Sequence, residues 1–218
     1  MKVVCHEVSL ALHSRKGMSE KSLELWRTGV LVGEKPLPQN VLEEFTALIR
    51  PNHKVRRANH PTELFDEYQV PIHLALKLME ICKPEIDAIR ELSFTTPLLR
   101  DDNAVINLTK KQSTLTSSYV FHHDNKLRHY RLILLLDDAD CASATRYILC
   151  SNRPLRRLLE WRKKQLGVSA TQAAKVKELT LEAGRYYCID TSGWHAAGNP
   201  ELRRRATVNL CFDPVYPI

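Results

Sequence analysis

The sequence lacks several features that would assign it to a particular class of protein. No apolar run approaches the roughly 20 residues that a membrane-spanning helix requires, and charge interrupts the N-terminal apolar stretch too early for a signal peptide. The six cysteines are scattered and include no Cys-x-x-Cys pair, so we expect most of them to be buried and reduced. These absences predict a cytoplasmic protein without a membrane segment.

The chain also contains no internal repeat, no low-complexity tract and no linker that would divide it. Its 218 residues are enough for one compact domain with a hydrophobic core. Hydrophobic residues make up 44% of the chain and charged residues 26%, which is ordinary for a globular protein. We therefore expect a single domain over residues 1–218.

Positive charge is concentrated in the second half of the chain. The formal net charge is +7, and the excess lies largely in two clusters, Arg153 to Lys164 and Arg203 to Arg205. A basic surface can attract nucleic acid or an anionic small molecule, although such a run is more often a solvated helix face. Nucleic acid therefore stays open as a partner, behind a small-molecule or peptide substrate. The oligomeric state is not indicated.

Residues 1–100 predict a mainly helical flank. Apolar residues recur at helical spacing over about 39–50, 73–82 and 84–92, and each of these ranges predicts a helix. A segment around Val8, Leu10 and Leu12 alternates as a strand does. The sequence leaves open whether this half adds strands to the main sheet.

From about residue 101 the pattern changes to short strands. Segments rich in β-branched and aromatic residues lie at 104–108, 115–121, 131–136, 146–150, 178–181, 185–190 and 206–212. One helical insertion, over about 152–176, interrupts them: Ser151 to Pro154 is a helix start signal, and Gly167 ends the first of two helices. The pattern predicts an α+β, mainly β fold, with a sandwich or open barrel flanked by N-terminal helices.

Four residues form an ordered pattern that suggests metal chemistry. His122 and Asp124 stand two residues apart at a strand end, so their side chains point to the same face. In a chain with nine histidines this pair alone carries little weight, and a surface hydrogen bond would explain it. However, His195 follows a later strand and a turn, and Arg205 comes ten residues after it, where the last strand begins. Two imidazoles and one carboxylate suit iron(II) with open positions, and an arginine fork suits the far carboxylate of a 2-oxo acid.

Residues 121–138 and 184–214 resemble the core of the iron(II)/2-oxoglutarate-dependent oxygenases. The His-x-Asp, the strand led by Arg131 and the spacing of His195 and Arg205 are similar to the aspartyl/asparaginyl β-hydroxylase-like branch. His195 to Asn199 is similar to the phytanoyl-CoA dioxygenase-like branch, where the arginine usually falls one residue later. The resemblance covers about half the chain. It implies a double-stranded β-helix core (jelly-roll, cupin-like) over residues 101–218.

The resemblance also implies roles for individual residues. His122, Asp124 and His195 would bind Fe(II), and Arg205 would bind the distal carboxylate of the co-substrate 2-oxoglutarate. Arg131 would face the co-substrate as well, although the histidine that usually follows two residues later is absent here. The implied reaction uses O2, decarboxylates 2-oxoglutarate to succinate and hydroxylates an unactivated C–H bond of an amino acid, a peptidyl residue or a small natural product.

Three alternatives stay open at this point. Arg203 or Arg204 could take the place of Arg205 as the anchor. The basic clusters could serve an oxygenase that acts on nucleic acid. The chain could also be a non-catalytic, metal-binding cupin-like module.

Overall fold

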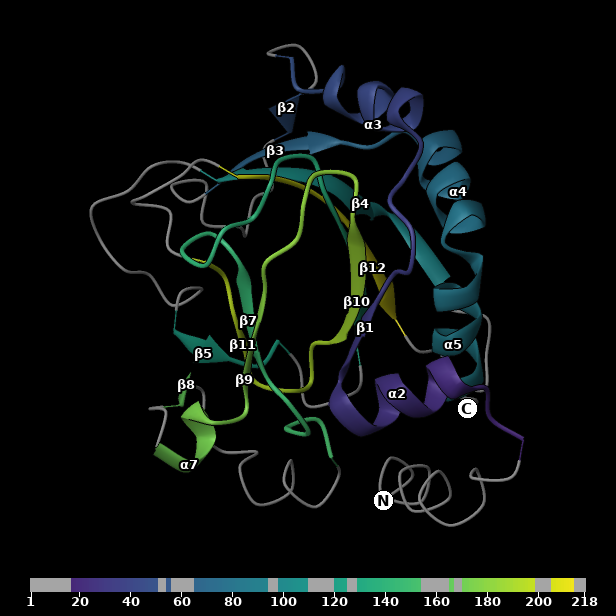
Figure 1. The fold of residues 1–218 in the computed structure, drawn as a ribbon. Coiled ribbons are helices and arrows are strands. Elements are labelled where there is room, and N and C mark those ends of the chain that lie inside the picture. Colours follow the sequence, from purple (N-terminus) through teal and green to yellow (C-terminus); the bar gives the residue numbers. More distant parts are fainter. Residues whose placement is uncertain are drawn as a thin grey trace.

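The computed structural model describes residues 17–50, 54–55, 65–93, 98–109, 120–124, 129–153, 165–166, 170–198 and 205–213. Within these residues two β-sheets pack against each other, and helices cover the outer face of the larger sheet (Figure 1). No described helix is long and apolar enough to cross a bilayer.

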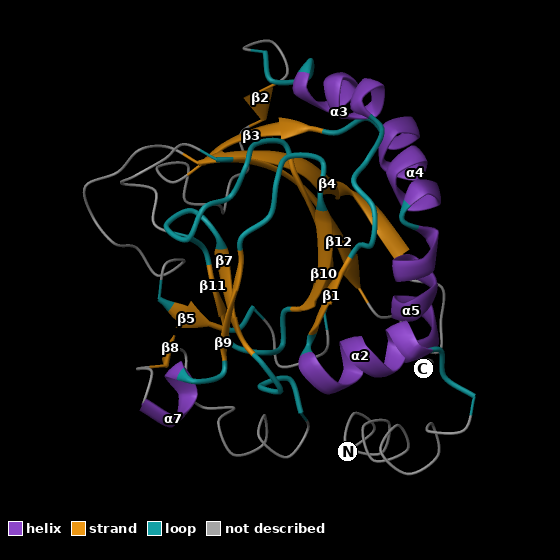
Figure 2. Ribbon diagram, viewed as in Figure 1, coloured by secondary structure: helices purple, strands orange, loops and turns teal. Residues whose placement is uncertain are grey.

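The larger sheet has seven strands in the order β1-β10-β6-β12-β4-β3-β2, and the smaller has five in the order β8-β5-β11-β7-β9. The larger contains β1 (Val30–Val32), β2 (Lys54–Val55), β3 (Phe65–Gln69), β4 (Leu98–Thr109), β6 (Tyr130–Leu135), β10 (Tyr186–Asp190) and β12 (Ala206–Asp213). The smaller contains β5 (Phe121–His122), β7 (Thr145–Ile148), β8 (Gln165–Leu166), β9 (Val176–Leu179) and β11 (His195–Ala196). All neighbouring pairs are antiparallel, and from β4 to β12 the chain passes back and forth between the two sheets (Figure 2).

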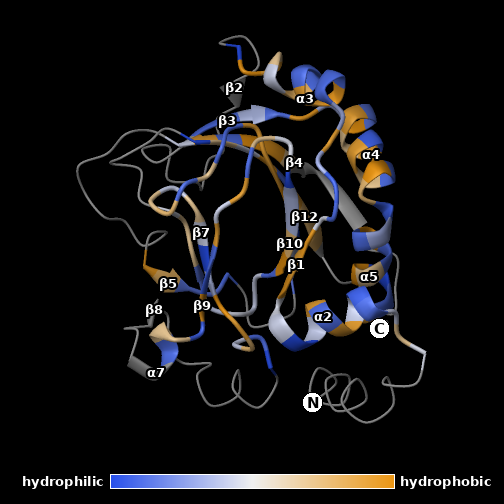
Figure 3. Ribbon diagram, in the orientation of Figure 1, coloured by the Kyte–Doolittle hydropathy of each residue, from blue (hydrophilic) through white to orange (hydrophobic). Residues whose placement is uncertain are grey.

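Helices from the first half of the chain bury the outer face of the larger sheet. They are α2 (Glu20–Thr28), α3 (Gln39–Thr46), α4 (Ile72–Ile81) and α5 (Lys83–Ser93); the short α7 (Ala170–Ala173) lies elsewhere, beside the smaller sheet. Hydrophobic residues recur along α4 and α5 (Figure 3), and the buried ones pack against alternate residues of the central strands, such as Leu132 and Leu134 of β6. The remaining residues of those strands therefore point toward the smaller sheet.

The space between the sheets holds a second core. Ile133 and Leu135 of β6 pack there with Tyr187 of β10 and Tyr147 of β7, and both tyrosines are fully buried. Residues that pair directly across neighbouring strands lie on the same face of a sheet. The inner face of each strand can therefore be followed from these residues by alternation.

The predicted mixed fold with a helical flank is confirmed, and the three N-terminal helices appear at α3, α4 and α5. The flank is not only helical, because β1, β2 and β3 come from residues 1–100 and join the larger sheet. Within the predicted insertion over 152–176, residues 165–166 form strand β8 and not a helix, and the second helix is reduced to α7. Most of the predicted basic helix and of the strand over 115–121 lies outside the described residues, as does the segment around Val8.

Candidate metal centre

The smaller sheet places His122, Asp124 and His195 side by side. His122 on β5 pairs directly with His195 on β11, and His195 pairs with Tyr147 on β7, so both histidines share the inner face with Tyr147. One ligand atom from each of the three residues lies within 4.8 Å of the others. Oδ1 of Asp124 is 3.5 Å from Nε2 of each histidine. Ligand atoms held about 2.1 Å from one ion at right angles lie about 3 Å apart, so a small closing movement would accommodate an ion.

Backbone carbonyls orient both imidazole rings. Nδ1 of His122 lies 2.9 Å from the carbonyl oxygen of Val120, and Nδ1 of His195 lies 3.0 Å from that of Gly193. A carbonyl oxygen can only accept, so each Nδ1 carries the hydrogen. Nε2 is then the atom that each ring can offer to a metal when it carries no proton, and in both rings it faces Asp124. The donor set of two nitrogens and one oxygen fits the two-histidine, one-carboxylate facial arrangement for iron(II).

A tight turn between β10 and β11 presents His195. The Asp190 carboxylate accepts hydrogen bonds from the backbone N–H and hydroxyl of Ser192, and the Gly193 N–H donates to the Asp190 carbonyl at 3.0 Å. Tyr147 donates its hydroxyl hydrogen to the same carbonyl at 2.8 Å. A Cβ on Gly193 would come 1.9 Å from the Tyr147 hydroxyl oxygen, so the turn requires glycine at this position.

Asp124 forms an ion pair with Arg131, which begins the inner face of β6. Nη2 of Arg131 lies 2.6 Å from Oδ2 of Asp124, whose side chain is 23% exposed. Burial by itself would raise the pKa of the Asp124 carboxyl, but the charge of Arg131, together with the two neighbouring imidazoles, holds that pKa well below its usual value. Burial would likewise lower the pKa of His122, and hydrogen bonds to Asp124 and Val120 outweigh it and raise that pKa. The carboxylate therefore stays ionised and available as a ligand.

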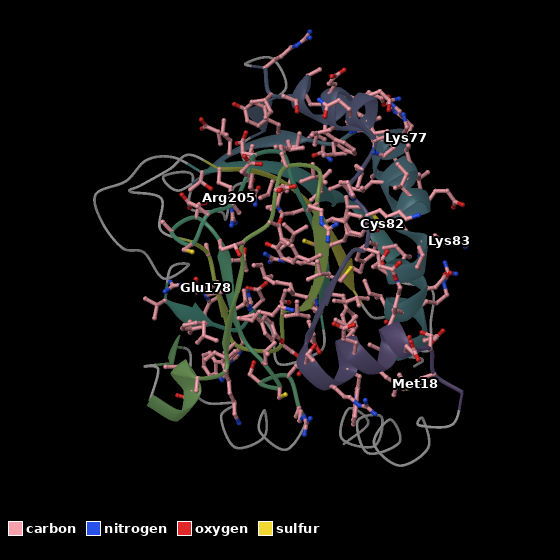
Figure 4. All side chains as sticks on the ribbon, viewed as in Figure 1. Met18, Lys77, Cys82, Lys83, Glu178 and Arg205 are labelled. Carbon is pink, nitrogen blue, oxygen red and sulfur yellow. The ribbon has the colours of Figure 1, made fainter. Side chains whose placement is uncertain are left out.

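Arg205 lies further along the inner face, where the chain enters β12 (Figure 4). Its Nη1 donates to the carbonyl oxygen of Ser143 at 2.6 Å and to Oγ1 of Thr145 at 3.2 Å. Among the described residues, Nη2 and Nε of Arg205 have no hydrogen-bond partner, so one edge of the guanidinium remains available for a carboxylate. Thr145 and the His195 partner Tyr147 are two residues apart on β7, about 7 Å along the strand.

Thr145 and Tyr187 join Arg205, although the sequence did not single them out. The buried Tyr187 hydroxyl donates to Oγ1 of Thr145 at 2.7 Å. Since Oγ1 accepts from both Tyr187 and Arg205, the Thr145 hydroxyl keeps its own hydrogen for another acceptor. The alternation of side chains along β7 and β10 would place both residues on the inner face once the pairing register of these strands is known. Arg203 and Arg204, the alternative anchors, lie outside the described residues.

Comparison with solved structures relates this arrangement to known enzymes. No protein-family model matches the chain, and no curated protein matches it. The epimerase SnoN of nogalamycin biosynthesis, a non-heme, 2-oxoglutarate (α-ketoglutarate)-dependent enzyme, is 15% identical over 88% of this chain and 81% of its own, with a TM-score of 0.62. HygX from Streptomyces hygroscopicus, solved with nickel and 2-oxoglutarate, is 14% identical over 92% and 88%, with a TM-score of 0.60. AviO1 from Streptomyces viridochromogenes Tue57 is 15% identical over 91% and 96%, with a TM-score of 0.57.

The chain shares the fold of non-heme iron, 2-oxoglutarate-dependent enzymes. Structures of SnoN and HygX contain iron or nickel together with 2-oxoglutarate, in agreement with the cofactors that the sequence pattern predicts. These neighbours do not show whether the chain is closer to the aspartyl/asparaginyl β-hydroxylase-like branch or to the phytanoyl-CoA dioxygenase-like branch.

Proposed function

We propose that this chain is an Fe(II)- and 2-oxoglutarate-dependent oxygenase with His122, Asp124 and His195 as its metal ligands. The observation that carries the proposal is the convergence of three ligand atoms within 4.8 Å, with both histidine Nδ1 atoms engaged by backbone carbonyls. The passage of the chain back and forth between the sheets supports a double-stranded β-helix core. We further propose that residues 1–218 form one domain, since the larger sheet contains strands from both halves.

Arg205 would bind the distal carboxylate of 2-oxoglutarate. The free edge of its guanidinium supplies two parallel donors, and Thr145 supplies a third from the same place. Thr145 lies about 7 Å along β7 from Tyr147, the residue that pairs with His195. A five-carbon dicarboxylate can therefore reach from Arg205 to the metal ligands. Burial of Tyr187 raises the pKa of its phenol, although the nearby Arg205 charge opposes the rise, so Tyr187 stays a neutral hydrogen-bond donor.

The proposed reaction hydroxylates an unactivated C–H bond while 2-oxoglutarate is converted to succinate and carbon dioxide. Bound iron supplies the activation of O2 that this chemistry requires. The chain positions the reactants: three protein ligands on one side leave the opposite side open. Asp124 fills the position that would have to be empty for a halide ligand, which favours hydroxylation over halogenation. His195 is the most buried of the three ligands, and the side chains of His122 and Asp124 are each about one quarter exposed, so access is from their side.

For the substrate we propose a small molecule. HygX has been solved with hygromycin B bound, and that likeness of fold favours a natural product over an amino acid or a peptidyl residue. SnoN is an epimerase, so the product must be examined directly: hydroxylation adds one oxygen atom to the substrate, whereas epimerisation leaves its mass unchanged. Most of the basic residues behind the nucleic-acid alternative lie outside the described residues.

Succinate formation tests the proposal. The purified protein, supplied with Fe(II), 2-oxoglutarate and O2, should form succinate even without substrate, and Asp124→Ala and His195→Ala should each abolish it. His73→Ala, an exposed histidine on α4, is the matched control and should keep the activity. The reaction class is wrong if the wild-type protein forms no succinate. The ligand assignment is wrong if either ligand variant remains near normal.

A further inference from the structure

The two oxygens of the Asp124 carboxylate lie in different surroundings. Oδ1 faces Nε2 of His122 and Nε2 of His195 at 3.5 Å each. Oδ2 points the other way and is held by Nη2 of Arg131 at 2.6 Å. One oxygen is thus directed to the metal ligands and the other to an arginine.

Arg131 is fixed in place by the larger sheet. Its neighbour Leu132 is buried on the helix-covered face, so Arg131 is on the inner face. It pairs in register with Cys211 of β12 on one side and with Ile189 of β10 on the other. Because residues that pair in register lie on the same face, its side chain lies beside that of Cys211. These contacts hold Arg131 on a rigid element, whereas Asp124 lies in the turn that follows the two-residue strand β5.

We propose that Arg131 is a positioning residue for Asp124, which fixes the carboxylate so that Oδ1 alone is presented to the metal. The inference rests on the proposed ligand set. It assigns Arg131 a partner other than the co-substrate, because the guanidinium that would face 2-oxoglutarate is already engaged with Oδ2 of Asp124.

A carboxylate can bind a metal through one oxygen or chelate it through both, and Arg131 favours binding through one. A free carboxylate can rotate, turn away or chelate through both oxygens, and chelation would occupy one of the three open positions that the chemistry needs. A charge-assisted hydrogen bond to Oδ2 opposes all three changes. Partners that orient a metal ligand typically change metal affinity by about 10- to 100-fold when they are removed.

Metal titration without 2-oxoglutarate tests this role separately from co-substrate binding. Mn(II) binding, followed by electron paramagnetic resonance, should weaken by about 10-fold or more in Arg131→Met. Arg131→Lys keeps the charge and one donor and should recover part of the loss. The visible absorption of Co(II) bound to Arg131→Met should differ from that of the wild type, because the carboxylate changes its orientation. Arg185→Met should change neither measurement, since Arg185 donates to the Glu34 carbonyl at the exposed surface and not to Asp124.

The outcomes separate this inference from the proposed function. If the wild-type protein binds neither Mn(II) nor Co(II), the ligand set itself is wrong and the inference falls with it. If the wild type binds both ions and Arg131→Met matches it in affinity and in spectrum, Arg131 does not position Asp124 and only the inference is overturned. Tighter Mn(II) binding by Arg131→Met would also overturn it, since Arg131 would then act only as a repelling charge. Should Arg131→Met fail to fold, the comparison of Arg131→Lys with the wild type decides by the same two measurements.

Discussion

Replacing Arg205 provides a quantitative test of its proposed role as the co-substrate anchor. The free edge of its guanidinium can make two charge-assisted hydrogen bonds to one carboxylate, and each is worth about 1.5–3 kcal/mol. Losing both would weaken 2-oxoglutarate binding by about 3–6 kcal/mol, which corresponds to roughly a 10²- to 10⁴-fold rise in its dissociation constant. Arg205→Met should show this loss. Arg205→Lys keeps the charge but not the fork and should fall between Arg205→Met and the wild type.

Calorimetric titration of 2-oxoglutarate into the Co(II)-loaded protein measures the effect without turnover. Arg185→Met is a suitable control, because Arg185 donates to the Glu34 carbonyl at the exposed surface and has no contact with the anchor. The anchor assignment is refuted if Arg205→Met binds 2-oxoglutarate within about twofold of the wild type, since this is far below the calculated loss. Equal weakening by Arg185→Met would instead point to a general effect on the fold.

Two other changes should have distinct effects. Gly193→Ala would bring a Cβ 1.9 Å from the hydroxyl oxygen of the buried Tyr147, so the turn before β11 must shift. We therefore expect Co(II) affinity to fall at least tenfold, measured by calorimetric titration. Unchanged affinity would contradict the role of this turn in positioning His195. Burial alone would raise the pKa of Glu91, but hydrogen bonds from Ser22 and Ser19 lower that pKa below its ordinary 4.5. Glu91 therefore stabilises the fold above pH 4.5, and its contribution is lost as the pH falls through the lowered pKa. Urea unfolding between pH 7 and pH 3 should show a smaller loss of stability on acidification in Glu91→Gln, and identical pH profiles would count against this contact.

The spacing of apolar residues along the sequence predicted the helices and strands that bury one side in a hydrophobic core. Helices α3, α4 and α5 and the long strands β6, β10 and β12 were expected close to their observed positions. Strands β1 and β3 were missed, because β1 has only three residues and β3 is mostly polar, so neither shows a clear apolar alternation. Their place in the sheet depends on pairing with β10 and β4, which lie far away in the sequence. Strand β8 was mistaken for helix, since its two residues take their conformation from pairing with β5.

The candidate site was predictable where chain order and residue type carry the information. His122, Asp124 and His195 could be selected from the sequence because i and i+2 share a face and a later strand-end histidine completes the set. The ion pair between Arg131 and Asp124 could not, because it depends on how β6 lies beside the turn after β5. Thr145 and Tyr187 were missed for the same reason: their hydrogen bond joins strands of different sheets.

Strand β1 has a consequence for how the protein could be dissected. Val30 to Val32 cover one side of β10, and the Gly29 carbonyl accepts the backbone N–H of Asp190 at 2.9 Å, directly before the turn that presents His195. A fragment beginning after Gly33 would leave β10 as an open, apolar sheet edge prone to association. It would also leave the buried Asp190 N–H without its acceptor. The predicted helical flank and double-stranded β-helix core would therefore not survive as separate pieces, and a split-protein design would need to keep residues 29–32 with the C-terminal part.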